Sequence, residues 1–187
     1  MRRRVLVLTG PVHSGKTTFL KGAAASWGLA GFSVGGFLNE TCLAGGKVKG
    51  YDLFDLRERA SVPFLRTEGG PDRQRVGGFS LVPGGLERAE SILARDRDAH
   101  ILVVDEIGPL ELSGRGLWPA LSAALSAGAM CLCVVRTSAL EGFIAKMGKG
   151  KIDVFRHGDT DVLEGLTRRI LEETGPKLRM ERKRRRT

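Results

Sequence analysis

VLVLTGPVHSGKTT, residues 5–18, is the stretch that decides the fold. Its first five residues are aliphatic apart from one threonine, which is typical of a central parallel strand buried on both faces. The segment GPVHSGKT then matches the phosphate-loop pattern G-x-x-x-x-G-K-[ST], and a predicted helix follows at once. Because strand, loop, lysine, threonine and helix agree, a simple glycine turn explains this stretch poorly. The sequence therefore predicts a phosphate-binding loop at residues 10–17.

The residue types in the loop suit the phosphates of a nucleotide. Glycines let backbone N–H groups converge on phosphate oxygens, and the helix N-terminus adds partial positive charge. We expect Lys16 to reach the β- and γ-phosphates and the Thr17 hydroxyl to bind Mg²⁺. His13 is expected to face solvent, since a catalytic histidine needs an oriented partner. The loop residues predicted to contact the nucleotide are Gly10, Pro11, Val12, His13, Ser14, Gly15, Lys16, Thr17 and Thr18.

A pair of acidic residues ends a second strongly apolar segment. ILVVDE, residues 101–106, has four apolar residues followed by two acids, which is the Walker B pattern. Ligands of parallel sheets bind at the carboxyl ends of strands, so we expect Asp105 beside the loop, holding Mg²⁺ through water. Glu106 either orients or deprotonates a water that attacks the γ-phosphate, or is an ordinary surface acid. Asp105 and Glu106 complete the predicted nucleotide site, with Thr17 and Asp105 as metal ligands.

Arg136 ends the next apolar strand, CLCVVR, on the same edge of the predicted sheet. A guanidinium group at this position can stabilise charge that develops on the γ-phosphate, as an arginine finger supplied in cis. A solvent-facing charge or a salt bridge explains the residue equally well. The predicted catalytic set is therefore Lys16, Glu106 and Arg136.

Three further features near this edge have two interpretations each. Glu40 ends the predicted strand 33–40 and either positions water or metal or closes the site electrostatically. Glu111 either orders the loop after the acidic strand or is exposed. Segment 137–151 is either a lid over the phosphates or, as we favour, a solvated loop, and a short helix is possible within it. Its candidate lid residues are Lys146, Lys149 and Lys151.

Strand and helix patterns alternate along the chain, which predicts an α/β fold with a mainly parallel sheet flanked by helices. Residues 45–66 carry turn and strand signals without a helix between them, so we expect an antiparallel hairpin and edge strand there. The other predicted strands are 5–9, 33–40, 100–112, 129–136 and 152–158. Predicted helices begin near residues 16, 86 and 114, and a last one ends at Gly175.

Length and charge indicate the domain organisation. The 187 residues suit one domain, 1–176, followed by a basic tail, 177–187. Most of the net charge of +9 lies at the two ends, because residues 2–4 contribute +3 and the tail, with seven basic residues and one glutamate, contributes +6. Such a tail can make weak electrostatic contacts with RNA or an acidic protein, but a solvated tail is the simpler interpretation. The oligomeric state does not follow from these features.

The sequence gives no indication of membrane insertion or of a disulfide framework. No apolar run approaches the length of a bilayer span, and residues 5–8 are too few for the apolar region of a signal peptide. The three cysteines, Cys42, Cys131 and Cys133, have neither an even count nor CxxC spacing, which fits a reducing compartment. We therefore expect a cytoplasmic protein.

GPVHSGKTT, GGFLNE, GGKVKGYDLFDL, VDEIGPLEL and VVR together resemble the THEP1-type nucleoside-triphosphatases, a family of P-loop proteins. DEIGPLEL is the most specific segment, and the resemblance spans roughly residues 5–172. It implies a RecA-like core, Mg²⁺, and slow hydrolysis of several nucleoside triphosphates to diphosphate and phosphate. It also implies nucleotide binding at residues 10–17, metal and water roles for Asp105 and Glu106, and the equivalence of Arg136 to an arginine that commonly follows the family's next strand.

The chain departs from the pattern of this family at two places. A basic residue usually follows the glutamate of the second strand, whereas ETCLAGG, residues 40–46, contains none. Lys47 stands where arginine is commoner, and the aromatic residue of the same hairpin is Tyr51. If those arginines contact nucleotide or a partner in the family, affinity or specificity differs in this chain.

Three functions are compatible with these features. The first is a Mg²⁺-dependent nucleoside-triphosphatase of low base selectivity, since the chain lacks the N-K-x-D element of GTPases. The second is a small-molecule or nucleotide kinase, for which residues 66–75 could supply lid arginines, although VVDEIGP is typical of a hydrolase. The third is a nucleotide-gated module whose tail binds RNA or an acidic protein. The tail lacks interleaved aromatic residues, which argues against sequence-specific RNA recognition.

Overall fold

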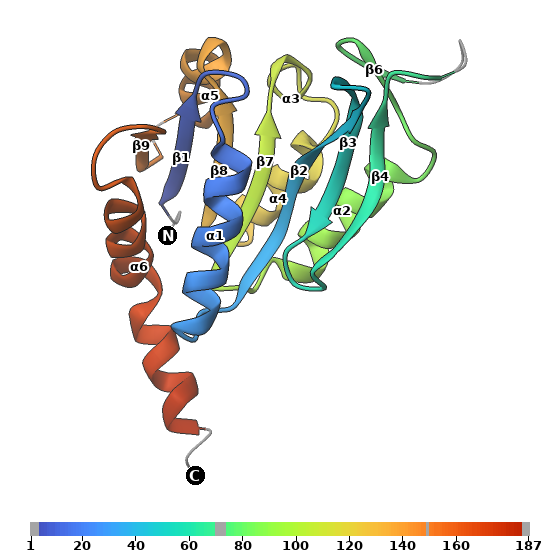
Figure 1. Ribbon diagram of the computed structural model, residues 1–187. Coiled ribbons are helices and arrows are strands. Elements are labelled where there is room, and N and C mark those ends of the chain that lie inside the picture. Colours follow the sequence, from blue (N-terminus) through green and yellow to red (C-terminus); the bar gives the residue numbers. More distant parts are fainter. Residues whose placement is uncertain (1–3, 70–73, 149, 185–187) are drawn as a thin grey trace.

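The computed structural model describes residues 4–69, 74–148 and 150–184, with residues 176–184 described by their backbone alone. Within these residues the chain forms one nine-stranded sheet in the order β5-β6-β4-β3-β2-β7-β8-β1-β9. Helices cover both faces of the sheet, as Figure 1 shows. The predicted α/β fold is confirmed. No helix in the described ranges combines the length and the apolarity that a membrane span needs.

Five parallel strands form one half of the sheet. The three strands at the centre of this half carry the apolar runs that predicted them, because both faces of these strands are covered. β8 lies between β1 and β7, so the strand of the phosphate loop and the strand of the acidic pair are not neighbours. In sheet order these strands are β2 (Val34–Ala44), β7 (Ile101–Ile107), β8 (Cys131–Arg136), β1 (Val5–Gly10) and β9 (Ile152–Arg156).

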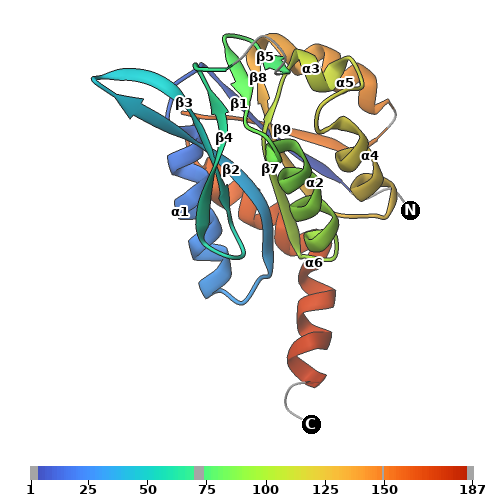
Figure 2. The same cartoon turned by 90° about the vertical axis from the view of Figure 1, so that its right-hand side faces the viewer.

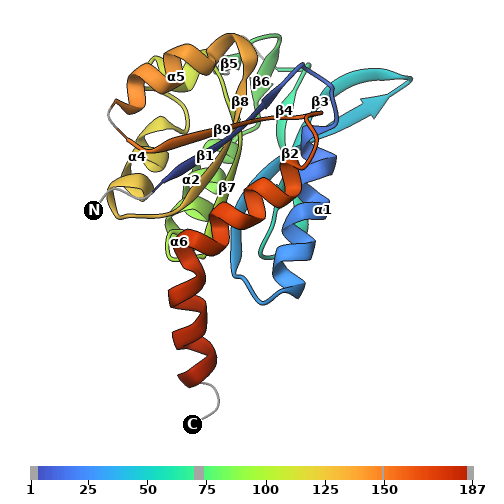
Figure 3. The same cartoon turned by 90° about the vertical axis from the view of Figure 1, so that its left-hand side faces the viewer.

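The other half of the sheet is antiparallel, as predicted for residues 45–66. β2 pairs in parallel with β7 only over residues 34–37 and continues as one arm of a hairpin with β3. Gly45 and Gly46 form the turn with φ of 57° and 72°, values that glycine adopts at little cost. The hairpin projects from the body of the molecule (Figures 2 and 3). The antiparallel strands are β3 (Lys47–Asp55), β4 (Ala60–Arg66), β5 (Arg75–Val76) and β6 (Phe79–Leu81).

Helices on the two faces of the sheet bury two separate apolar cores. α1 (Lys16–Leu29) and α6 (Val162–Arg184) cover one face, where they lie side by side (Figure 3) and the Trp27 indole donates a hydrogen bond to the Thr167 hydroxyl at 2.9 Å. The opposite core contains Cys131 and Cys133, which are fully buried on one face of β8 as free cysteines. The helices over this core are α2 (Gly85–Asp96), α4 (Trp118–Ser126) and α5 (Leu140–Met147).

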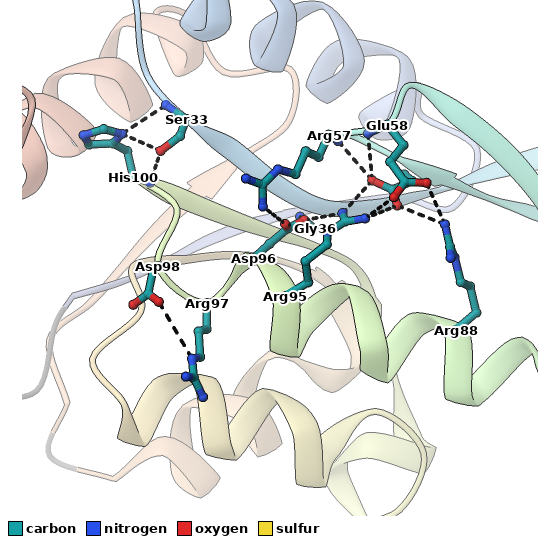
Figure 4. Close-up of polar contacts among 11 residues, drawn as sticks. Ser33, Gly36, Arg57, Glu58, Arg88, Arg95, Asp96, Arg97, Asp98 and His100 are labelled. Carbon is teal, nitrogen blue, oxygen red and sulfur yellow. Dashed lines mark hydrogen bonds and ion pairs between the residues drawn. The ribbon is translucent and has the colours of Figure 1, made fainter. Parts of the chain in front are cut away.

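An ionic network at the amino-terminal end of β2 fixes the hairpin to α2 (Figure 4). The buried Asp96 carboxylate accepts hydrogen bonds from the Gly36 N–H at 3.0 Å and from the Arg95 guanidinium at 2.7 and 2.8 Å. Arg95 also binds Asp55 at the end of β3 at 2.9 Å, and Arg57 binds Asp96 at 2.9 Å. This network therefore sets the position of the strand pair that runs towards the phosphate loop.

Two predicted boundaries after the acidic pair are wrong. The strand predicted to reach residue 112 ends at Ile107, because Pro109 starts the short helix α3 (Pro109–Leu112). The next helix begins at Trp118 instead of residue 114, because Gly114 and Gly116 have φ of 84° and 57° and form a turn. The short helix considered possible in segment 137–151 is present: a 3₁₀ turn, Thr137–Ala139, leads into α5, which the buried Phe143 fixes to the core.

The last helix does not end at Gly175 as predicted, but continues to Arg184. Glycine ends a helix where it adopts a positive φ, and the backbone at Gly175 stays helical. Gly175 and Pro176 belong to the two residue types least favourable inside a helix, so helix propensity does not explain the continuation. The predicted boundary at residue 176 thus falls inside α6, while the side chains of the basic tail lie outside the described residues, as do residues 2–3 at the other basic end.

Candidate active site

The phosphate loop borders an open cleft of about 440 Å³ at the carboxyl edge of the parallel strands. One wall is the loop, the floor is formed by the ends of β7 and β8, and the opposite wall is the inner face of the β2–β3 hairpin. The lining residues are Val12–Thr18, Asn39, Thr41, Leu43, Val48, Tyr51, Leu65, Asp105, Glu106 and Arg136. The cleft thus brings together the predicted residues Lys16, Thr17, Asp105, Glu106 and Arg136.

The loop wraps around the ammonium group of Lys16, whose side chain is nearly buried. Lys16 Nζ donates hydrogen bonds to the carbonyl oxygens of Gly10 at 3.0 Å and Pro11 at 2.6 Å. Gly15 precedes the helix with φ of 92°, which only glycine adopts readily. His13 is exposed, as predicted. The group that lies at the centre of the loop is the ammonium group of Lys16.

Thr17 and Asp105 meet at the floor of the cleft. The Thr17 hydroxyl donates to Asp105 Oδ2 at 2.9 Å, and the Asn39 backbone N–H donates to the same oxygen at 3.2 Å. Burial raises the pKa of Asp105 to about 6, against the effect of these hydrogen bonds. A buried carboxylate beside a hydroxyl is the oxygen donor set that Mg²⁺ prefers, and a divalent cation would offset the cost of burying the charge. The two residues therefore fit a magnesium site.

Glu106 and Arg136 form an ion pair on the other side of Asp105. Arg136 Nε donates to Glu106 Oε2 at 2.8 Å, and both side chains keep contact with solvent, 22% for Glu106 and 47% for Arg136. The register between β7 and β8 shifts between Asp105 and Ile107, so Glu106 has no partner residue in β8. The sequence left two alternatives for Arg136, a salt bridge or a position beside the nucleotide. In the structure Arg136 forms the salt bridge and also lines the cleft.

Glu40 and Glu111 lie outside the cleft and contact other groups. Glu40 binds Lys21 and accepts a hydrogen bond from Ser61 at 2.8 Å, on the face of β2 that points away from the cleft. The interpretation of Glu40 as a residue that positions water or metal is therefore wrong. The buried Glu111 carboxylate accepts the Gly108 N–H at 3.0 Å and the Leu117 N–H at 3.5 Å, so it orders the loop after β7. Burial raises the pKa of Glu111.

The lysines of segment 137–151 do not support the lid interpretation. Lys146 Nζ lies 4.3 Å from the centre of the Trp118 ring, a cation–π contact on α4. Lys151 is exposed before β9 and its carbonyl accepts the Val5 N–H at 2.9 Å. Lys149 and residues 70–73 of the candidate lid segment 66–75 lie outside the described residues.

Two residues of the site were not predicted from the sequence. His157, directly after β9, donates from Nε2 to the Ser14 carbonyl at 2.8 Å, and its ring lies 5.4 Å from that of Phe19. This hydrogen bond therefore fixes the phosphate loop to the segment that follows β9. Asn39 borders the cleft one position before Glu40, and it is the only asparagine in the sequence. Both residues lie near the ends of strands that the sequence pattern predicts. Their contacts with the phosphate loop and with Asp105 depend on the tertiary structure, so the pattern alone does not single them out.

The sheet order and the loop together define a P-loop nucleotide-binding protein of the RecA-like type. A family model described as NTPase matches residues 5–162, and the chain belongs to this family of nucleoside-triphosphate hydrolases. The THEP1-type resemblance is thereby confirmed.

Curated relatives and solved structures agree with this assignment. The nucleoside-triphosphatase THEP1 of Methanopyrus kandleri is 30% identical over 169 residues, which cover 89% of this chain and 93% of the relative. A human cancer-related nucleoside triphosphatase matches in structure with a TM-score of 0.66 at 26% identity, covering 89% of this chain and 95% of that one. The crystal structure of THEP1 from Aquifex aeolicus matches with a TM-score of 0.65 at 18% identity, covering 87% of this chain and 96% of that one. At this identity the match shows a common fold.

Proposed function

We propose that this protein hydrolyses several nucleoside triphosphates to the diphosphate and phosphate, with Mg²⁺ bound at Thr17 and Asp105. The observation that carries the proposal is that the Thr17–Asp105 contact and the Glu106–Arg136 ion pair lie in the same cleft as the phosphate loop. These are the metal, water and charge-stabilising groups that phosphoryl transfer to water requires.

Each group has a separate task in this proposal. When the nucleotide binds, the hydrogen bonds of Lys16 to the carbonyl oxygens of Gly10 and Pro11 are replaced by hydrogen bonds to the β- and γ-phosphate oxygens. The other loop residues, as far as Thr18, make the remaining nucleotide contacts. Glu106 accepts a proton from the attacking water, and Arg136 stabilises charge on the γ-phosphate. Bound Mg²⁺ would neutralise charge on the β- and γ-phosphates.

The proposal includes broad base specificity. The chain has no N-K-x-D element, and the cleft wall opposite the loop carries the aliphatic side chains of Leu43, Val48 and Leu65 beside Asn39, Thr41 and Tyr51. Aliphatic side chains present no hydrogen-bond pattern that distinguishes one base from another. We therefore expect rates with ATP, GTP, CTP and UTP to agree within about tenfold.

A phosphate-release assay with the four triphosphates, with Mg²⁺ or with EDTA, tests the proposed function. We expect release without any added acceptor and its loss in EDTA and in Lys16→Ala. A kinase would release little phosphate until its acceptor is supplied, so phosphorylation of an added acceptor without hydrolysis in its absence would contradict the proposal. Undiminished release in EDTA would refute the magnesium assignment alone.

A further inference from the structure

Asn39 lines the cleft, and its side-chain amide oxygen is buried. Its Oδ1 is inaccessible to solvent and has no hydrogen-bond partner among the described protein atoms. Leaving a buried polar oxygen without a partner costs about 1–3 kcal/mol, so such an atom in a native site calls for a ligand or a water. The backbone N–H of the same residue is fixed on Asp105 Oδ2 at 3.2 Å, which holds Asn39 against the acidic strand.

A small internal cavity of about 60 Å³ adjoins the cleft at this position. Asn39, Glu106 and Arg136 line both spaces and therefore stand between them. Glu111 adds a second carboxylate to the wall of the cavity. A single water needs roughly 10–15 Å³ and a few polar partners. Most of the cavity lining is apolar, but the cavity has room for a water beside the polar side chains of Asn39, Glu106 and Arg136.

The ion pair with Arg136 leaves one oxygen of Glu106 available. Arg136 binds Oε2, and no described protein atom donates to Oε1. A water between Glu106 Oε1 and Asn39 Oδ1 would donate one hydrogen to each oxygen and keep its lone pairs for phosphorus. Two acceptors fix the orientation of a water better than one carboxylate alone, and orientation is a large part of the barrier to an in-line attack.

We propose that Asn39 and Glu106 together hold the attacking water, an inference that rests on the proposed function. The water oxygen forms a bond to the γ-phosphorus while the bond from that phosphorus to the β,γ-bridging oxygen breaks. The electron pair of the broken bond stays on the leaving diphosphate. One proton of the water passes to Glu106, and the other remains on the new phosphate oxygen after donating to Asn39 Oδ1.

The test compares Asn39→Ala with Ser80→Ala. Ser80 is a suitable control because its hydroxyl oxygen is also buried without a partner among the described protein atoms, but it lies on β6 and lines neither the cleft nor the cavity. We expect Asn39→Ala to lower kcat by about tenfold to a hundredfold and to change KM less than about threefold. Ser80→Ala should keep both constants within about twofold. An Asn39→Ala variant with wild-type kcat overturns the proposal.

Affinity for a transition-state analogue separates orientation of the water from a structural defect. ADP with aluminium fluoride and Mg²⁺ places a planar group and an axial water where γ-phosphate and nucleophile would be. Asn39→Ala should bind this mixture at least about tenfold more weakly than the wild type while it binds ADP equally well. Equal loss of both affinities would show a structural role and overturn the proposal.

Two further outcomes complete the test. A crystal structure of the wild type with ADP, aluminium fluoride and Mg²⁺ should place a water within hydrogen-bond distance of both Asn39 Oδ1 and Glu106, and it decides the question even if Asn39→Ala fails to fold. A water held by Glu106 without Asn39 refutes the inference and leaves the proposed hydrolysis intact. If the wild type releases no phosphate from any triphosphate, the proposed function fails, and the inference about Asn39 fails with it.

Discussion

Asp96→Ala should destabilise the protein strongly, although the residue is remote from the phosphate loop in the sequence. The substitution leaves the buried Gly36 N–H without its acceptor and removes two hydrogen bonds of 2.7 and 2.8 Å from Arg95. Asp96 has 1% of its surface exposed, so water does not replace these bonds. Breaking a buried ion pair costs about 3–5 kcal/mol, a large share of the typical free energy of unfolding.

Urea unfolding followed by circular dichroism measures this effect. Asp96→Ala should lower the free energy of unfolding by about 3–5 kcal/mol and the Tm by about 10 °C. Asp98→Ala is the matched control, because the Asp98 side chain is 92% exposed and exposed ion pairs contribute little, so we expect a change below about 0.5 kcal/mol. An Asp96→Ala variant within about 1 kcal/mol of the wild type would refute the structural role of the network.

The same network predicts how stability depends on pH. Burial alone would raise the pKa values of Asp55 and Asp96, but hydrogen bonds from Arg95 outweigh it and hold both pKa values below the usual range. A carboxylate with a lowered pKa in the folded state stabilises that state above its unfolded pKa, about 3.9, and the contribution disappears as pH falls through the folded pKa. Wild-type stability should therefore fall below about pH 4, where the difference from Asp96→Ala becomes smaller.

Three other changes test separate contacts. Glu111→Ala removes the acceptor of two buried N–H groups and should lower the free energy of unfolding by about 2–3 kcal/mol. It should also lower kcat, because the loop after Glu106 loses its support. Urea unfolding curves identical to those of the wild type would contradict this. His157→Ala frees the Ser14 carbonyl and should weaken triphosphate binding in calorimetry by about three- to tenfold, whereas unchanged affinity would exclude the clamp. Deletion of residues 177–187 should leave phosphate release within about twofold, because the described end of α6 extends away from the turn between β1 and α1 (Figure 1). A larger loss would implicate the tail in hydrolysis.

Local patterns were sufficient to predict the core of the fold. The buried strands β1, β7 and β8 and the phosphate loop follow from apolar runs and from glycine spacing, which report local backbone preferences directly. The hairpin near residues 45–66 was predicted from turn residues for the same reason. Gly175 shows the limit of this reasoning, since a glycine can end a helix or lie within it, and the local sequence does not decide which.

Pairings between distant segments could not be predicted in the same way. Glu40 and Asn39 are neighbours in β2, and strand alternation places their side chains on opposite faces. The sequence singled out the charged residue, whereas the face that borders the cleft carries the asparagine. His157 and the Ser14 carbonyl are 143 positions apart, and only the parallel pairing of β1 with β9 brings them together. Such contacts depend on register, which composition does not encode.

Glu106→Gln gives the most direct test of the central claim that this cleft hydrolyses nucleoside triphosphates with Glu106 as the base. Phosphate release and ATP affinity should be measured on the same preparation in the presence of Mg²⁺. The glutamine keeps the side-chain length and an acceptor for Arg136 but cannot take a proton at neutral pH, so we expect kcat to fall by about 10²- to 10⁴-fold while the affinity for ATP stays within about threefold. A variant that binds ATP and releases phosphate at the wild-type rate would contradict the account.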